Sequence, residues 1–168
     1  MTAIEFKNWV TLNKDVLYRF AYSILLDSHY AQDIVQDVLI KLWLQGDKTY
    51  QIKSLEAWCF TVTKNKCLNK LKKLSYQNKT QILYKKENYN PNDYLEAKEL
   101  EHIIENIMLR LNGIQRAIMH LRDYEELDYS SISERLDITV SNVKIQVHRA
   151  RKFIKETLQK EYGYEQDF

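Results

Sequence analysis

The chain has 168 residues, and its 25 Lys and Arg nearly balance its 23 Asp and Glu. A formal net charge of +2 is too small to name a partner, so any nucleic-acid signal must come from how the charges are distributed. An apolar content of 45% with one Pro and three Gly excludes collagen, a disordered chain and a turn-rich sandwich. We therefore expect mostly helix, in one ordinary domain or two small modules.

The sequence disfavours metal sites, disulfide bonds, a signal peptide and membrane spans. Cys59 and Cys67 have no Cys-x-x-Cys motif or nearby His pair, so we expect buried reduced thiols and neither a metal site nor a disulfide framework. The first residues carry acid and lack an apolar stretch with a cleavage site, so no signal peptide is expected. Apolar runs are too short to predict a membrane span. No cofactor is expected.

The N-terminal half predicts consecutive amphipathic helices. The first should run from about Trp9 to Leu26, and Asp27 and Ser28 supply polar capping residues before the second. Apolar residues of the second helix recur at helical spacing on one face, and we expect Trp43 among them to be core. That face holds Ile34, Val35, Val38, Leu39, Leu42 and Trp43.

A polar loop leads to a third predicted helix, which starts near Ser54, whose hydroxyl can cap it, and which carries a basic face. Lysines follow one another from position 64 to 86 without one Asp or Glu, beside amides such as Asn65 and Asn69. They are Lys64, Lys66, Lys70, Lys72, Lys73, Lys79, Lys85 and Lys86. Cations beside amides and aromatic rings suit a nucleic-acid strand, including an opened one. The alternative is an ordinary solvated surface.

Periodicity fades after the third helix, and the chain becomes polar around its only proline, Pro91. We predict a flexible linker at residues 76–92 between two helical modules, at residues 8–75 and 93–162. The second module should begin with an acidic helix from about Asn92 to Leu111, followed by a short helix around residues 114–123.

The pattern near the C-terminus is typical of a helix-turn-helix. Asp128 can cap a short helix, Ser133 is small where two helices cross, and Asp137 tolerates the left-handed turn. The second helix turns a polar and basic set outward, with no acid between Thr139 and Lys155. The outward set is Ser141, Asn142, Lys144, Ile145, Gln146, His148, Arg149, Arg151 and Lys152. Amides can read base edges and cations can pair with phosphates. The alternative is a solvated basic face on an ordinary helix hairpin.

Two stretches of the chain resemble a known family. AQDIVQDVLIKLW followed by LEAWCFTVTKNKCLNKLKK resembles region two of the sigma-70 family. LNGIQRAIMHLRDYEELDYSSISERLDITVSNVKIQVHRAR resembles region four. The order of the two regions and the linker length are similar to the extracytoplasmic-function group of sigma factors. The resemblance implies an all-α protein of two helical modules that gives promoter recognition to bacterial core RNA polymerase.

The resemblance also implies roles for individual positions. The helix that docks on polymerase is matched by Asp33, Gln36, Asp37, Leu39, Ile40 and Lys41. The helix that engages the opened −10 element is matched by Trp58, Asn65, Asn69 and Lys72, and residues 47–53 match the specificity loop. The lysines of the basic face, Lys64, Lys66, Lys70 and Lys73, join the expected DNA-binding set on their charge. The recognition helix for the −35 element is matched by Asn142, Lys144, Gln146, His148, Arg149 and Arg151. Asn142 and Gln146 replace the family's frequent Thr and Arg, so the preferred bases need not be the usual ones.

Two other functions compete with this one. A free-standing, dimeric helix-turn-helix regulator would bind duplex DNA alone, but the lysine face of the N-terminal half has no use in a dimerisation domain. An enzyme is disfavoured because the four histidines are scattered and no phosphate loop or nucleophile elbow is present. We therefore expect a non-enzymatic cytoplasmic protein with polymerase and promoter DNA as partners. An anti-sigma factor inserted between the modules is a further partner that the resemblance allows.

Overall fold

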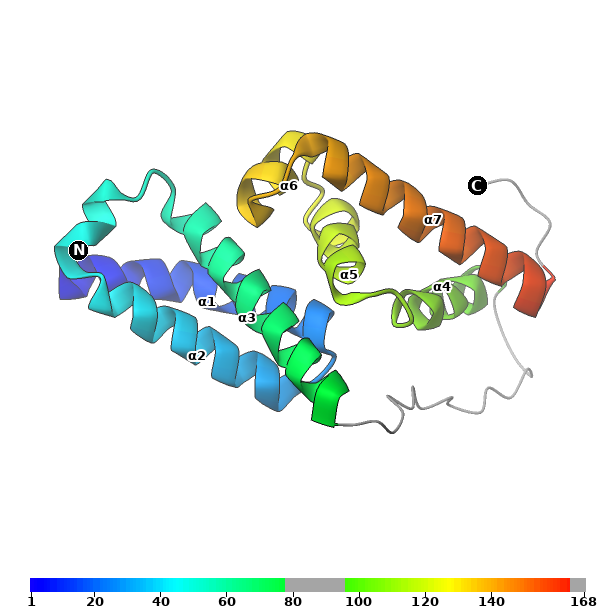
Figure 1. Cartoon of the computed structure of the whole chain (residues 1–168), viewed down its shortest axis with the longest axis horizontal. Coiled ribbons are helices and arrows are strands. Elements are labelled where there is room, and N and C mark those ends of the chain that lie inside the picture. The colour runs from blue at the N-terminus through cyan, green and yellow to red at the C-terminus, as the bar shows by residue number, and fades with distance from the viewer. Residues whose placement is uncertain (78–95, 164–168) are drawn as a thin grey trace.

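The computed structural model describes residues 1–77 and 96–163, and every regular element in these ranges is helical (Figure 1). The N-terminal module contains α1 (Ala3–Leu25), α2 (Ser28–Leu44), the 3-10 turn η1 (Gly46–Gln51) and α3 (Leu55–Gln77). The C-terminal module contains α4 (Glu96–Met108), α5 (Gly113–Met119), the π turn η2 (His120–Tyr124), α6 (Tyr129–Leu136) and α7 (Val140–Tyr162). The predicted all-α class with two helical modules is confirmed.

The predicted linker lies mostly outside the described residues. Positions 76 and 77 still belong to α3, and nothing from 78 to 95 is described. The acidic helix predicted from about Asn92 is described only from Glu96 onward, as α4. No helix in the described ranges is both long and apolar enough to span a membrane.

Helix α1 begins well before the position predicted from its apolar pattern. The Thr2 hydroxyl accepts a hydrogen bond from the Glu5 N–H at 3.2 Å, and the Glu5 carboxylate accepts one from the Thr2 N–H at 2.7 Å. This capping box satisfies two N–H groups at the helix start and stabilises the extra turns. At the other end Leu26 adopts a left-handed conformation (φ 55°), and Asp27 caps α2 as predicted.

The core of the N-terminal module forms where α1, α2 and α3 meet. Phe20 of α1 and Phe60 of α3 are both buried, with ring centroids 4.8 Å apart. Cys59 and Cys67 are buried and free, as predicted, and burial raises the pKa of each thiol to about 12. Ser54 caps α3 as predicted, its hydroxyl accepting from the Ala57 N–H at 3.1 Å.

The prediction that Trp43 is a core residue is wrong. Its side chain is 45% exposed, and its ring rests against Phe6 with centroids 5.0 Å apart. The inward stripe of α2 ends with the buried Leu42, and the next residue points about 100° away on a helix. Trp43 therefore lies at the margin of the core, where only the early part of α1 covers one side of it. Trp9 and Trp58 are half-buried and pack against the core.

Side-chain caps define the helix-turn-helix. Asp128 accepts a hydrogen bond from the Ser131 N–H at 2.7 Å and caps the start of α6. This hydrogen bond lowers the pKa of the Asp128 carboxyl. Asp137 adopts the predicted left-handed conformation (φ 49°), and Ser133 donates to the Ile138 carbonyl at 2.6 Å across the turn. Thr139 caps α7. The start of α7 is thus held in place from both sides of the turn.

Candidate polymerase and nucleic-acid interfaces

The predicted polymerase-docking residues form a mostly exposed face on α2. Asp33, Gln36, Asp37, Ile40 and Lys41 are exposed, and Ile40 is 58% so. Leu39 is half-buried and packs against the core instead. The face therefore offers carboxylates, an amide and an apolar side chain at helical spacing, the combination suited to binding another helix.

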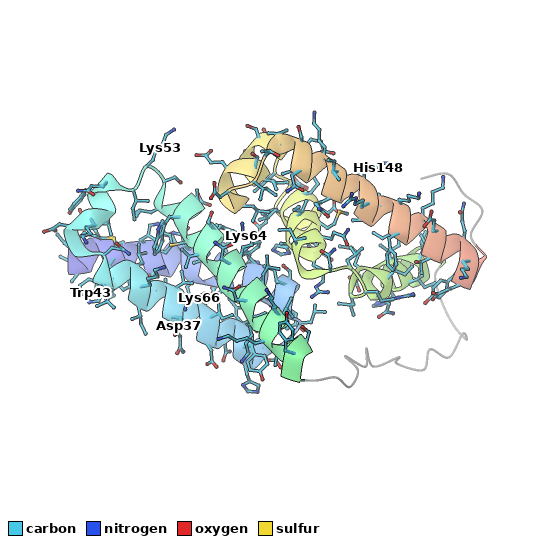
Figure 2. All side chains as sticks on the ribbon, viewed as in Figure 1. Asp37, Trp43, Lys53, Lys64, Lys66 and His148 are labelled. Carbon is cyan, nitrogen blue, oxygen red and sulfur yellow. The ribbon has the colours of Figure 1, made fainter. Side chains whose placement is uncertain are left out.

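Side chains of α2 hold several of the predicted DNA-binding residues of α3. The Lys66 ammonium lies 2.8 Å from a carboxylate oxygen of Asp37. Both residues are labelled in Figure 2. Lys70 lies over the Tyr30 ring, 3.7 Å from its centroid. Lys41 lies over the Trp58 ring at 5.6 Å. The face predicted to dock on polymerase and the face predicted to bind the −10 strand are therefore neighbours that share an ion pair.

Four of the residues predicted to bind the −10 strand are exposed. Asn65, Asn69, Lys72 and Lys73 are exposed along the outer side of α3. They provide two amides and two cations on consecutive turns, which is the chemistry expected of a surface that follows a single strand.

Lys64 differs from the other lysines of this set because it is buried, with 7% of its surface exposed. Its ammonium donates to the Leu136 carbonyl at the C-terminal end of α6, and Figure 2 shows it between α3 and the C-terminal module. Burial lowers the pKa of Lys64, and Asp137 offsets part of this effect. In this arrangement Lys64 binds a helix end and is not available to DNA.

Further contacts join the two modules around Lys64. Thr61 donates to the Arg135 carbonyl at 3.0 Å, and the Arg135 guanidinium lies 2.6 Å from the Glu56 carboxylate. Arg135 also lies over the Phe60 ring, 4.8 Å from its centroid. Helix α6 is therefore attached to α3 by its last residues, as Figure 1 shows from their adjacent positions.

Arg116 of α5 makes the second connection between the modules, and sequence reasoning missed it. It is 8% exposed, and its guanidinium donates to Ser23 (3.0 Å) and Ile24 at the end of α1 and to Leu109 (3.2 Å) and Leu111. Cations favour the carbonyl-rich C-terminal ends of helices. The one available signal was a single basic residue inside the apolar run GIQRAIM.

The predicted specificity loop, residues 47–53, is largely the 3-10 turn η1. Thr49 is buried and donates to the Gly46 carbonyl at 2.7 Å, which ties the turn together. Tyr50 is 67% exposed, and its hydroxyl donates to Glu5 of α1 at 3.2 Å, which raises the pKa of Tyr50. The loop thus presents an aromatic ring to solvent near one end of α3.

The predicted −35 residues lie together on the outer side of α7, where Figure 2 marks His148. Eight of the nine are exposed, and Gln146 is half-buried and donates to the Asn142 side-chain oxygen at 3.4 Å. The inward residues Val143, Val147 and Ala150 are buried against α5 and α6. In contrast to Lys64, this face is open to a duplex. Among the described residues no group of three potential metal ligands gathers.

Comparison with known proteins agrees with this architecture. Sigma-70 region 2 matches residues 9–76, and Sigma-70, region 4 matches residues 101–154. The ECF RNA polymerase sigma factor SigW of Bacillus subtilis is 26% identical over 165 residues, which cover 91% of this chain and 88% of SigW. RNA polymerase sigma factor YlaC of the same bacterium is 27% identical over 158 residues, covering 86% and 91%.

A solved structure shares the fold. The sigma factor RpoE of Bartonella quintana, determined in complex with the anti-sigma factor NepR, superposes with a TM-score of 0.65 at 24% identity. The match covers 93% of this chain and 98% of that one. Both sigma-70 regions are therefore present, in the family's order and on the family's fold, and the chain belongs to the sigma-70 family as an alternative sigma factor of the extracytoplasmic-function (ECF) group.

Proposed function

We propose that this sigma factor, which directs transcription initiation, divides its work among the three faces described above. The α2 face docks on core RNA polymerase, the exposed amides and lysines of α3 bind the opened −10 strand, and the outer side of α7 binds the −35 duplex. The first two functions belong to a module at residues 8–75 and the third to one at residues 93–162. The observation that carries the proposal is the open, acid-free face of α7 on a capped helix-turn-helix.

The closed arrangement of the modules sets a condition on this mechanism. Lys64 can reach DNA only after α6 has left α3, because its ammonium is otherwise bound to the Leu136 carbonyl. At this contact the hydrogen bonds of Lys64 and Thr61, the Glu56–Arg135 ion pair and the contact of Arg135 with the Phe60 ring must break, and the apolar core that the two modules share must open. We propose that binding to polymerase and promoter provides the free energy for this separation.

The proposed mechanism consists of binding alone. Flipping and trapping a base costs a few kcal/mol of stacking, which a fitted surface offsets without covalent chemistry. We therefore propose a non-enzymatic protein that needs no cofactor and acts on polymerase in the cytoplasm. An anti-sigma factor is a further proposed partner, supported by the RpoE neighbour, which was solved as such a complex.

Two charge reversals separate the proposed roles. Lys144→Glu/Lys152→Glu on α7 should abolish promoter binding by the polymerase complex. Lys72→Glu/Lys73→Glu on α3 should keep binding at low temperature but lose strand opening, detected by permanganate reactivity of unpaired thymines. Lys7→Glu/Lys14→Glu makes the same charge change on exposed positions of α1 and serves as the control. Loss of opening in the control alone, or in none of the three, would contradict the assignment.

A further inference from the structure

Ile145 is the one member of the outward set on α7 whose side chain cannot hydrogen-bond, and Val140 at the start of the helix is a second exposed apolar residue of α7. Ile145 is 48% exposed, and its neighbours one turn away on the same side are Ser141, Asn142, His148 and Arg149, all exposed. A single exposed apolar residue is ordinary on a protein surface. Ile145, however, lies at the centre of a polar and cationic surface, where a residue that only faces solvent would be expected to be polar.

Ile145 does not contribute to the core of the helix-turn-helix. That contribution comes from Val143 and Val147, which lie two positions before and after it and are 0% and 3% exposed. A β-branched side chain also has a lower helix propensity than the Lys, Arg and Gln around it, so helix propensity does not account for Ile at this position.

The surrounding residues bring Ile145 close to base edges. The cap at Thr139 and the turn bond from Ser133 fix the first turns of α7, which is the part of a recognition helix that enters the major groove. Lys144, Arg149 and Lys152 are exposed on either side, where they can reach phosphates. When these cations contact the phosphates on the two sides of the groove, Ile145 faces the base edges at its floor.

The major groove presents one apolar group, the 5-methyl of thymine. We propose that Ile145 contacts this methyl and gives this sigma factor a preference for thymine at one position of the upstream element. The inference rests on the proposed function of the α7 face and adds a specific base to it. Removing the methyl should weaken binding about fourfold, the affinity equivalent of one buried methylene.

Deoxyuridine provides the test because it keeps the pairing of thymine and lacks only the methyl. Full-length chain bound to core polymerase would first select promoters from a duplex pool with a randomised upstream element. Each thymine of the selected element would then be replaced by deoxyuridine, and binding measured by competition at low temperature, for the wild type and for Ile145→Ala. Leu12→Ala removes an exposed apolar side chain from α1, outside the three proposed binding faces, and is the control.

We expect one position at which deoxyuridine weakens the wild type and the Leu12→Ala complex about fourfold and leaves the Ile145→Ala complex unchanged. Equal effects in all three proteins, or a selected element with no thymine that depends on Ile145, would overturn the inference while leaving the sigma function intact. A pool from which no sequence is enriched would overturn the proposed function of the α7 face, and the role of Ile145 with it.

Discussion

Replacing Arg116 by methionine should strongly destabilise the whole chain. The guanidinium supplies donors to four backbone carbonyls, those of Ser23, Ile24, Leu109 and Leu111, and methionine supplies none. A buried acceptor left without a donor costs about 1 kcal/mol or more. The bonds to Ile24 and Leu111 are buried and those to Ser23 and Leu109 are partly buried, so the loss should be about 2 to 4 kcal/mol. That is a large fraction of the total stability of an ordinary domain.

Urea unfolding followed by far-UV circular dichroism measures this loss through the transition midpoint and slope. Arg110→Met is the matched control, because Arg110 is partly exposed and its two bonds to Glu161, at 2.8 and 2.9 Å, form a surface pair. Removing such a pair should cost less than about 1 kcal/mol. If Arg116→Met cost no more than Arg110→Met, water would be replacing the guanidinium, and its assignment as the link between α1 and α5 would fail.

Three further outcomes are expected. Burial holds the pKa of His120 below its usual value despite the nearby Glu125 carboxylate, so as the pH falls the unfolded chain takes up a proton before the folded chain does. The free energy of unfolding should therefore decrease below about pH 6.5, and it should decrease less in His120→Asn. Equal pH dependence of both proteins in urea titrations would contradict this. The thiols of Cys59 and Cys67 should resist a disulfide reagent until urea unfolds the chain, and rapid labelling of the native protein would count against their burial. Lys144→Ala should lower the slope of log binding constant against log salt by about one, whereas an unchanged slope would mean no phosphate contact.

Local features of the fold were predictable because their causes lie within a few residues. Asp27, Ser54 and Asp128 were expected to cap helices, and each accepts a hydrogen bond from a backbone N–H three residues later. Asp137 was expected in a left-handed turn and has φ 49°. The early start of α1 was missed because its apolar pattern begins later than its capping box.

The docking of the modules was not predictable, because it depends on residues far apart in sequence. Lys64 and the Leu136 carbonyl are 72 positions apart, and Arg116 and the Ile24 carbonyl 92. Spacing identified Lys64 as one cation in a basic series, and it gives no sign that a helix end covers that cation. Trp43 shows a similar limit, since the pattern on α2 does not reveal where the covering helix stops. The DNA and polymerase roles of the α2, α3 and α7 residues stay predictions.

The most direct test of the central claim is transcription from a promoter template by bacterial core polymerase, with and without the purified chain. A sigma factor predicts RNA from a defined start site only when both proteins are present, accompanied by permanganate reactivity just upstream of that start. Tight duplex binding by the chain alone, with neither transcript nor opening when polymerase is added, would contradict it and favour a free-standing regulator.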